Sequence, residues 1–342
     1  MKLTMHLKER SYDIIMKAGC LANLHQFANL ANRKLFVLTD TGVPRQYAET
    51  VAAQSGDATI YAIPQGEASK SLKVYGQVLQ AMLDFGMTRK DLLVAVGGGV
   101  VGDLGGFCAA SYMRGIDFVN CPTTTLSQID SSIGGKTAID LGETKNIVGA
   151  FWQPKVVLVD FDTLATLPQR HVVNGLAEAV KTGLIGDPQL FAMFETEDPT
   201  AHMEQIIYRS LKFKKKIVEE DEREQGARAC LNFGHTIGHG IEAVKGVRGR
   251  RTTGLYHGEC VALGMLPMIE DPALVRRVRA VYRKLGLPTR TGADKQKVLA
   301  YMQHDKKGRG ESITVIRVPG LGCWRADSLP MTELPALLGL EG

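Results

Sequence analysis

The chain has 342 residues, of which 44% are hydrophobic and 23% are charged, a composition typical of globular proteins and long enough for about two domains. The formal net charge is only +5 and no basic stripe is interleaved with aromatic residues, so we expect no nucleic-acid partner. No apolar run approaches the ~20 residues of a membrane span, and the first residues lack the apolar core of a signal peptide, so we expect a cytoplasmic protein with no membrane partner.

Short apolar runs alternate with helical patterns through the first half of the chain. The alternation of residues 2–16 predicts a strand or hairpin at the edge of a sheet. The spacing of residues 71–87 predicts an amphipathic helix. Strand-like runs lie at 35–40, 58–63, 92–99, 117–123 and 156–160. Strands that alternate with helices predict an α/β domain with a mostly parallel sheet.

The pattern changes near residue 168. From 169 to 300 the periodicity is helical, and residues 312–319 are a lone late strand candidate. We therefore predict a dinucleotide-binding α/β domain at 1–168 and a mostly α-helical domain, which binds metal and substrate, at 169–342.

The cysteines form no CxxC pair, and most lie in apolar stretches. This predicts buried thiols in a reducing compartment rather than a disulfide framework or a zinc knuckle. They are Cys20, Cys108, Cys121, Cys230, Cys260 and Cys323.

A glycine-rich turn, GGGVVGD at 97–103, follows the strand-like run LLVAV and precedes a helical pattern. Gly97, Gly99 and Gly102 fit the G-x-G-x-x-G spacing, which lets backbone and a helix N-terminus approach a pyrophosphate. An acidic residue about 20 positions on is expected for the ribose, but Asp117 begins a strand. Asp40, which ends a strand, is the better ribose candidate. The alternative is a glycine turn that serves tight packing.

The stretch IGGKT at 133–137 resembles the end of a phosphate-binding P-loop. That motif requires glycine where Asp130 stands, so we exclude a P-loop NTPase, although Lys136 can serve a phosphate or an acidic group. Basic clusters at 212–216 and 246–251 are either solvated surface or a positive field over a phosphorylated substrate.

Three segments of the helical half offer metal ligands. Glu178 and Lys181 share one helix face, His235 and His239 are four residues apart, and YHGE at 256–259 supplies a histidine and a carboxylate. A carboxylate in the apolar segment around Glu178 needs a metal or Lys181 as partner. The spacing does not separate His235 from His239 as a ligand.

Long motifs resemble those of the 3-dehydroquinate synthases of the shikimate pathway, within the wider group of sugar phosphate cyclases. They lie at 97–154, 174–185 (NGLAEAVKTGLI), 231–242 (LNFGHTIGHGIE) and 257–265 (HGECVALGM). The resemblance covers nearly the whole chain. The segment between His235 and His257 is longer than the family pattern, as if the basic stretch 246–253 were inserted.

The resemblance implies one divalent metal, zinc or cobalt, held by Glu178, His235 and His257. It implies that His239 faces the substrate instead. It also implies NAD, bound by residues of the first domain. These are Asp40, Glu67, Ala68, Ser69, Lys70, Ser71, Leu72, Gly99, Val100, Val101, Gly102, Asp103, Thr123, Thr124, Lys136, Lys145, Phe161, Asp162, Thr163 and Leu164.

The implied substrate is a seven-carbon sugar acid phosphate, 3-deoxy-D-arabino-heptulosonate 7-phosphate. Transient oxidation by NAD, phosphate elimination, reduction, ring opening and intramolecular aldol closure would yield 3-dehydroquinate. Arg114 would reach the phosphate from the partner subunit of a homodimer. The other substrate residues implied are Asp130, Lys136, Asn146, Lys181, Lys214, Arg228, Asn232, His239 and, in the DKK stretch, Lys306 rather than Lys307.

Two other enzyme classes remain as alternatives. One is a cyclase that acts on another sugar phosphate, and the other is a metal-dependent alcohol or glycerol dehydrogenase. The stretches DSSIGGKTAID and DEREQGARACLNFGH favour the dehydroquinate branch. A non-catalytic NAD-binding protein is the remaining possibility, and the polar positions filled throughout the motifs argue against it.

Overall fold

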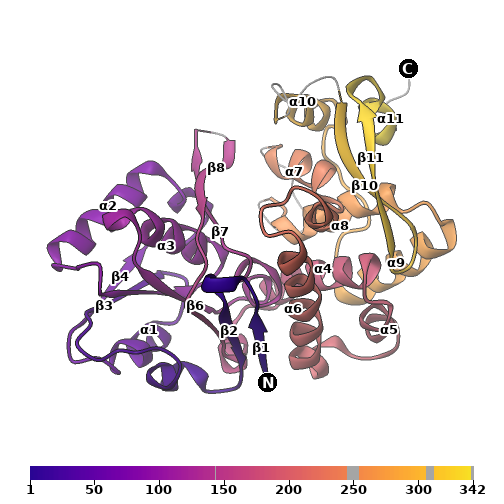
Figure 1. Cartoon of the computed structure of the whole chain (residues 1–342). Helices are drawn as coiled ribbons and strands as arrows, with labels where there is room; N and C mark the ends of the chain where they lie inside the picture. The colour runs from indigo at the N-terminus through magenta and orange to yellow at the C-terminus, as the bar shows by residue number, and fades with distance from the viewer. Residues whose placement is uncertain (143, 245–253, 306–311, 340–342) are drawn as a thin grey trace. The chain divides into compact units, whose positions relative to one another are not determined.

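The computed structural model describes residues 1–142, 144–244, 254–305 and 312–339 (Figure 1). These residues form two compact units. The first comprises Met1–Val172 with Lys214–Glu219, and the second comprises Val173–Phe213 with Glu220–Gly342. The division after Val172 lies inside helix α4 (Gln169–Ile185), close to the sequence change that we noted at residue 168.

The first unit is built on a seven-stranded sheet in the order β1-β2-β9-β6-β5-β3-β4. All neighbouring strands are parallel except β1, which pairs antiparallel with β2 at the edge, as the alternation of residues 2–16 predicted. The strands are β1 (Lys2–Met5), β2 (Tyr12–Met16), β3 (Leu35–Asp40), β4 (Ala58–Ile63), β5 (Leu92–Gly97), β6 (Asp117–Pro122) and β9 (Val156–Val159). The prediction of a mostly parallel sheet is confirmed.

The central strands are buried on both faces, which explains their continuous apolar sequences. Leu38 and Leu93 point to one apolar core, and Val37 and Val94 point to the other. Helices α2 (Leu72–Asp84) and α3 (Gly99–Ser111) contribute to the first core, and α1 (Arg45–Ala52) to the second. The sheet is therefore covered by helices on both sides.

The strand order reverses between β3 and β5. From this point β4 lies on one side and β6 and β9 lie on the other. In open parallel sheets, ligands bind beyond the carboxyl ends of the strands at such a switch point. Asp40 and Gly97, the last residues of β3 and β5, flank this position.

A hairpin of β7 (Lys136–Leu141) and β8 (Thr144–Phe151) forms a separate two-stranded sheet that the sequence did not predict. Most of its residues are exposed or half-buried, so its sequence carries no continuous apolar run.

The second unit is mostly helical, as predicted (Figure 1). Its helices include α5 (Pro188–Thr196), α7 (His235–Ala243), α8 (His257–Met265), α9 (Pro272–Leu285), α10 (Lys295–Asp305) and α11 (Leu334–Leu337). Helix α6 (Met203–Glu220) begins in this unit, and its residues Lys214–Glu219 belong to the first unit. The late strand β10 (Ser312–Gly320) is not alone, because β11 (Cys323–Pro330) pairs with it antiparallel. The prediction of a lone strand was wrong because β11 is largely exposed and polar.

The six cysteines are free thiols, and all except Cys323 on β11 are buried. Burial raises the pKa of Cys20 to about 12 and that of Cys230 to about 11, so these thiols are poor nucleophiles. Among the described helices, none is both long enough and apolar enough to cross a membrane.

Candidate active site and metal centre

Three helices of the second unit bring Glu178, His235 and His257 together. One ligand atom from each residue lies within 4.8 Å of the others. The Nε2 atoms of His235 and His257 lie 3.7 and 3.5 Å from the Oε1 atom of Glu178. Glu178 is only 1% exposed, so the two imidazoles approach a buried carboxylate.

Glycines allow α7 and α8 to pack closely enough for this arrangement. A Cβ atom on Gly264 would lie 2.1 Å from the carbonyl oxygen of Gly234, and one on Gly238 would lie 3.1 Å from that of Cys260. The start of α7 therefore contacts the end of α8, and the helices run antiparallel. This packing brings His257, the first residue of α8, alongside the last turn of α7.

The electrostatics of the cluster keep Glu178 charged. Burial alone would raise the pKa of Glu178, but the charge of Lys181 and the two imidazoles hold it well below its usual range. Burial and the Lys181 charge lower the pKa of His235, which is therefore neutral near pH 7. Burial opposes the charged form of His257, yet contacts with Glu178 and Glu242 raise its pKa to about 10.

This donor set fits a divalent metal ion. Neither carboxylate oxygen of Glu178 has a hydrogen-bond partner among the described residues, although Lys181 forms an ion pair with Oε2. An ionised carboxylate and two imidazole nitrogens are the usual three protein ligands of a catalytic metal that keeps a position open.

His239 is placed differently from His235. It is exposed, and its ring lies edge-on to that of His235 with 5.2 Å between the centroids. His239, Glu242 and His257 also form a group whose potential ligand atoms lie within 4.8 Å of one another, but its carboxylate is less buried than Glu178.

Other candidate substrate residues of this unit lie near Glu178 or His235 in the sequence, and specific hydrogen bonds hold their side chains. Lys181 is 2% exposed, and its Nζ donates to the Leu231 carbonyl at 2.8 Å. Arg228 is 1% exposed and donates to the Glu222 carbonyl at 2.5 Å. Asn232 is exposed and donates to Glu224 at 2.7 Å.

In the first unit the glycine turn (97–102) connects β5 to α3 at the switch point. Gly98 and Gly99 immediately precede and begin α3. A Cβ atom on Gly99 would lie 3.1 Å from the Ser131 Oγ atom, and one on Gly102 would lie 3.2 Å from the Asn120 amide. Glycine therefore avoids close contacts at the N-terminus of α3, and a helix N-terminus is the kind of position where a pyrophosphate binds well.

The neighbouring strand ends carry the other candidate cofactor residues. Asp40 is 8% exposed and accepts the Gly42 N–H at 2.7 Å, and burial raises its pKa. The backbone N–H of Thr123 donates to the Gly97 carbonyl at 2.9 Å, so the Thr123–Thr124 pair lies next to the glycine turn. Beyond β9, the short helix η6 (Phe161–Thr166) contains the candidates from Phe161 to Leu164.

The segment EASKSL (67–72) opens onto a cavity of about 290 Å³. Within this segment Lys70 is almost fully buried, and its Nζ donates to Asp103 at 2.7 Å and also to the Asn146 side chain. Burial lowers the pKa of Lys70, but the charges of Asp103 and Glu67 outweigh burial and the net shift is upward. Lys145 forms a 3.5 Å ion pair with Glu67. The buried Lys70 ammonium thus links Asp103, a candidate cofactor residue, to Asn146, a candidate substrate residue.

Two further candidates meet in the first unit. The Lys214 Nζ lies 2.5 Å from the Asp130 carboxylate and donates to the Asp130 carbonyl at 2.8 Å. Lys136 is exposed at the start of β7. Lys306, Lys307 and the whole of the basic stretch 246–253 lie outside the described residues.

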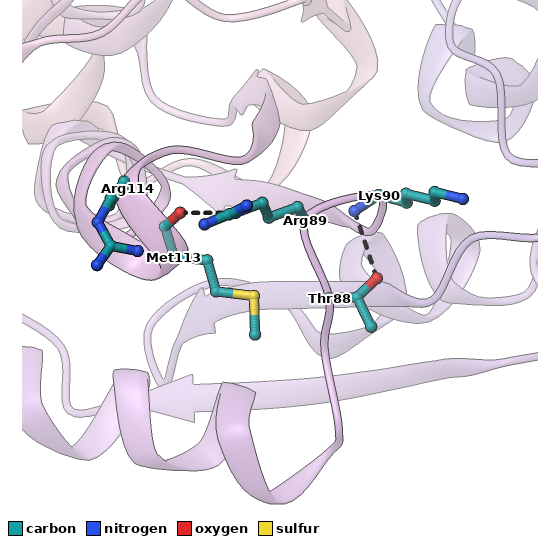
Figure 2. Close-up of a pocket in the computed structure, with 5 residues that line it drawn as sticks. All are labelled: Thr88, Arg89, Lys90, Met113 and Arg114. Carbon is teal, nitrogen blue, oxygen red and sulfur yellow. Dashed lines mark hydrogen bonds between the residues drawn. The ribbon is translucent and has the colours of Figure 1, made fainter.

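Arg114 lies in an unusual loop at the end of α3. Met113 and Arg114 have φ angles of 48° and 69°, a left-handed conformation that is costly for residues other than glycine. Arg89 Nε donates to the Met113 carbonyl at 3.1 Å, and Arg89, Lys90 and Arg114 line an open cavity of about 690 Å³ (Figure 2). The strained loop thus presents Arg114 beside two other cationic residues.

Two carboxylates near the candidate residues were not predicted from the sequence. Glu242 contacts the Nδ1 atom of His257 at 3.2 Å, and Glu224 accepts from Asn232 with a φ of 59° at its own backbone. Glu242 follows His235 by two helical turns, and this spacing indicates that both side chains lie on one face of α7. The sequence does not show that Glu242 contacts His257, because His257 lies on a different helix.

The fold is that of the sugar phosphate cyclases. A solved structure of 2-epi-5-epi-valiolone synthase from Streptomyces hygroscopicus subsp. jinggangensis, with NAD⁺ and Zn²⁺ bound, matches 97% of each chain with a TM-score of 0.83 and 28% identity. A 2-deoxy-scyllo-inosose synthase complexed with carbaglucose-6-phosphate, NAD⁺ and Co²⁺ matches 99% of each chain with a TM-score of 0.87, at 24% identity. A probable glycerol dehydrogenase from Sinorhizobium meliloti shares the fold at a TM-score of 0.62.

Sequence comparison narrows this class to one family. The family models "3-dehydroquinate synthase N-terminal" and "3-dehydroquinate synthase C-terminal" match residues 60–174 and 175–308. The 3-dehydroquinate synthases of Streptococcus thermophilus and Streptococcus suis are 40% and 41% identical to the chain and cover 99% and 98% of it, with the same shares of their own lengths. The chain belongs to the 3-dehydroquinate synthase family. Its activity is the conversion of 3-deoxy-D-arabino-heptulosonate 7-phosphate to 3-dehydroquinate and phosphate.

Proposed function

We propose that Glu178, His235 and His257 hold the divalent metal, zinc or cobalt, that this reaction uses. The proposal depends on one observation, which is that two imidazole Nε2 atoms approach a buried, ionised carboxylate. A bound metal ion would supply Lewis acidity toward hydroxyl and carbonyl oxygens of the substrate. Lys181 keeps the carboxylate ionised, since its ammonium forms an ion pair with Glu178.

We further propose that NAD binds at the carboxyl edge of the sheet. Bound NAD would supply the hydride acceptor and donor of the transient oxidation. The glycine turn offers N–H groups to the pyrophosphate, and Asp40, at the switch point, can accept hydrogen bonds from a ribose. The cavity along Glu67–Leu72, the Thr123–Thr124 pair and the η6 residues from Phe161 to Leu164 would line the rest of the cofactor.

The basic candidates suit a substrate with a carboxylate and a phosphate. Lys214 and Arg228 are held in fixed positions by Asp130 and by the Glu222 carbonyl, so they lose little freedom when an anion binds. Lys136, Lys181, Asn146, Asn232 and Lys306 complete the proposed substrate set. His239 is exposed beside the cluster, where an imidazole can move a proton to or from a bound substrate. We assign NAD binding to 1–168 and metal binding to 169–342.

The cytoplasm and a homodimer are part of the same proposal. Buried free thiols agree with a reducing compartment. Arg114 would act on the active site of the partner subunit. The strained loop at Met113 and Arg114 fixes the backbone from which this side chain extends.

Mixed subunits test the action of Arg114 across a dimer. Arg114→Ala and His235→Ala chains are each expected to be nearly inactive. After they are unfolded and refolded together, half of the dimers should be mixed and each should contain one intact site. Phosphate release should then recover to about a quarter of the wild-type rate. If the mixture stays as inactive as its parents, Arg114 does not act on the partner subunit.

The metal and cofactor assignments are tested with the purified chain. We expect stoichiometric zinc or cobalt and phosphate release from 3-deoxy-D-arabino-heptulosonate 7-phosphate without accumulation of NADH. Replacing Glu178, His235 or His257 with Ala should remove the metal and the turnover together. Full metal content in all three variants would exclude the assignment. Net accumulation of NADH with a simple alcohol would favour the dehydrogenase alternative.

A further inference from the structure

The two histidines of the metal cluster have different partners on their outer nitrogens. His235 Nδ1 lies 3.2 Å from the backbone carbonyl of Phe233, and His257 Nδ1 lies 3.2 Å from the Oε2 atom of Glu242. In both rings the Nε2 atom faces Glu178. A carbonyl or carboxylate can only accept a hydrogen bond, so each contact favours the tautomer that carries its proton on Nδ1.

The position of Glu242 follows from the packing of α7 on α8. His235 and Glu242 are seven residues apart on α7 and therefore share one face of the helix. The glycine contacts make the helices antiparallel, with Gly234 against Gly264 and Gly238 against Cys260. The same alignment, continued by one turn, brings Glu242 to the first turn of α8, where His257 lies.

Glu242 could also be read as a metal ligand, since it forms a second group with His239 and His257. The His257 atom that contacts Glu242 is Nδ1, and a metal bound through Nδ1 would leave Nε2 against the buried Glu178 carboxylate. It would also leave that carboxylate and His235 outside the site. The first group uses the more buried carboxylate and satisfies both outer nitrogens, so the geometry favours an orienting role for Glu242.

We infer that Glu242 is a positioning residue of the metal centre: its carboxylate accepts the Nδ1 proton of His257 and holds the ring with Nε2 toward Glu178. This inference rests on the metal site proposed above and adds a residue to it. A carboxylate partner both fixes the orientation of a ligand imidazole and increases its electron donation. Loss of such a partner typically weakens metal binding by about 10–100-fold.

The test measures metal binding in the absence of substrate. Apo forms of the wild type, Glu242→Ala and Glu242→Gln are titrated with Zn²⁺ in competition with a chromophoric chelator. Visible spectra are then recorded with saturating Co²⁺. Glu195→Ala and Glu195→Gln are matched controls, because Glu195 is a carboxylate of the same unit that pairs with Arg277. Melting temperatures of the apo proteins identify variants that fail to fold.

We expect Glu242→Ala to weaken zinc binding by about 10–100-fold, while the cobalt spectrum at saturation reports the same number of ligands as in the wild type. Glu242→Gln retains an acceptor oxygen and should fall between Glu242→Ala and the wild type. Both Glu195 variants should match the wild type.

Three results would overturn the inference. Zinc affinity of Glu242→Ala equal to that of the wild type would show that Glu242 does not act on the metal centre. A cobalt spectrum that reports the loss of a ligand, together with metal binding that survives in His235→Ala, would make Glu242 a ligand itself. If the wild type binds neither metal, the metal site proposed above fails, and the role of Glu242 fails with it.

Discussion

The two units of the molecule build their candidate sites from different materials. In the α/β unit the glycine turn, Asp40 and the Thr123–Thr124 pair offer backbone and short side chains at the ends of parallel strands, where the sheet topology brings them together. In the helical unit the site consists of long, ionisable side chains from three helices, and their meeting depends on the packing of those helices. The first kind of site should tolerate changes in individual side chains, whereas the second should not.

Glycine serves both units, in different ways. In the glycine turn, under the proposed binding of NAD, it would clear space at a helix N-terminus for the cofactor to approach the backbone. In α7 and α8 it clears space for one helix to approach the other, because Cβ atoms at Gly238 and Gly264 would meet backbone atoms of the neighbouring helix. The same residue type would therefore serve binding in one unit, whereas it serves helix packing in the other.

The largest effect is expected from Glu178→Gln. This change removes the charge that balances the buried Lys181 ammonium, and breaking a buried ion pair costs about 3–5 kcal/mol of unfolding free energy. Metal content and turnover should be lost as well, while the affinity for NAD should stay within about twofold of the wild type. Urea unfolding, metal analysis and NAD titration measure the three effects.

The double variant Glu178→Gln with Lys181→Met separates the loss of stability, which comes from the unpaired Lys181 ammonium, from the loss of the metal, which comes from the missing carboxylate. Replacing both members of a buried pair is much less costly than removing one, so most of the stability should return while metal binding stays absent. An equally strong loss of NAD and metal binding in Glu178→Gln would contradict the expectation that the two ligands bind independently.

Gly264→Ala is expected to have the next largest effect. Its Cβ atom would lie 2.1 Å from the Gly234 carbonyl oxygen, so α7 and α8 must move apart. Overpacking of this kind costs about 1–3 kcal/mol, and the displaced His235 should also bind metal more weakly. Urea unfolding and zinc titration check both parts. A stable variant with weakened NAD binding but unchanged zinc binding would contradict the expectation that the packing of α7 on α8 supports the metal site.

Asp91→Asn tests a side chain on which the stability of the α/β unit is expected to depend. Asp91 accepts hydrogen bonds from the Thr88 N–H at 2.5 Å and from the Lys34 N–H at 2.8 Å, in the turn that carries Arg89 and Lys90. Burial would raise the pKa of Asp91, but these bonds hold it below its usual value. The variant should lose about 1–3 kcal/mol of stability near pH 7.

The pH dependence of that loss has a definite sign. A carboxyl group with a lowered pKa in the folded state stabilises the protein above its unfolded pKa of about 3.9, and this stability is lost as the pH falls through the folded pKa. Unfolding curves of wild type and variant should therefore converge below about pH 4. A difference that grows on acidification would contradict the role of the ionised carboxylate.

The smallest effect on stability is expected from Gly99→Ala. Its Cβ atom would lie 3.1 Å from the Ser131 Oγ atom, which can shift, so the fold should lose less than about 1 kcal/mol. The added methyl group stands where the pyrophosphate would approach, and the affinity for NAD should fall about tenfold, or 1.4 kcal/mol. Zinc binding should not change.

Gly76→Ala is the control for this substitution. Gly76 is an exposed glycine within α2, and apart from its chain neighbours and the nearby backbone of α2 no heavy atom lies within 4 Å of the position of an added Cβ atom. Alanine there should stabilise the helix by about 0.5–1 kcal/mol without affecting NAD binding. Equal NAD affinities in the two variants would remove the glycine turn from the cofactor site.

The sequence alone determined the sheet, because the strands β3, β5 and β9 are continuous apolar runs that must be buried on both faces. It also determined the glycine turn and the residue types of the three candidate ligand segments, since these are local patterns of residue type and spacing. Hairpin β7–β8 and strand β11 were not predictable in this way, because their exposed residues carry no apolar periodicity.

Tertiary structure alone decided which side chains meet. The four-residue spacing of His235 and His239 is the same in any helix, and only the approach of α4 and α8 gives His235 the buried Glu178 as neighbour. Only the glycine-mediated packing of α7 on α8 gives His257 its contact with Glu242. Periodicity along a chain reports which face of an element is buried, but distances between residues far apart in sequence arise only when the elements pack.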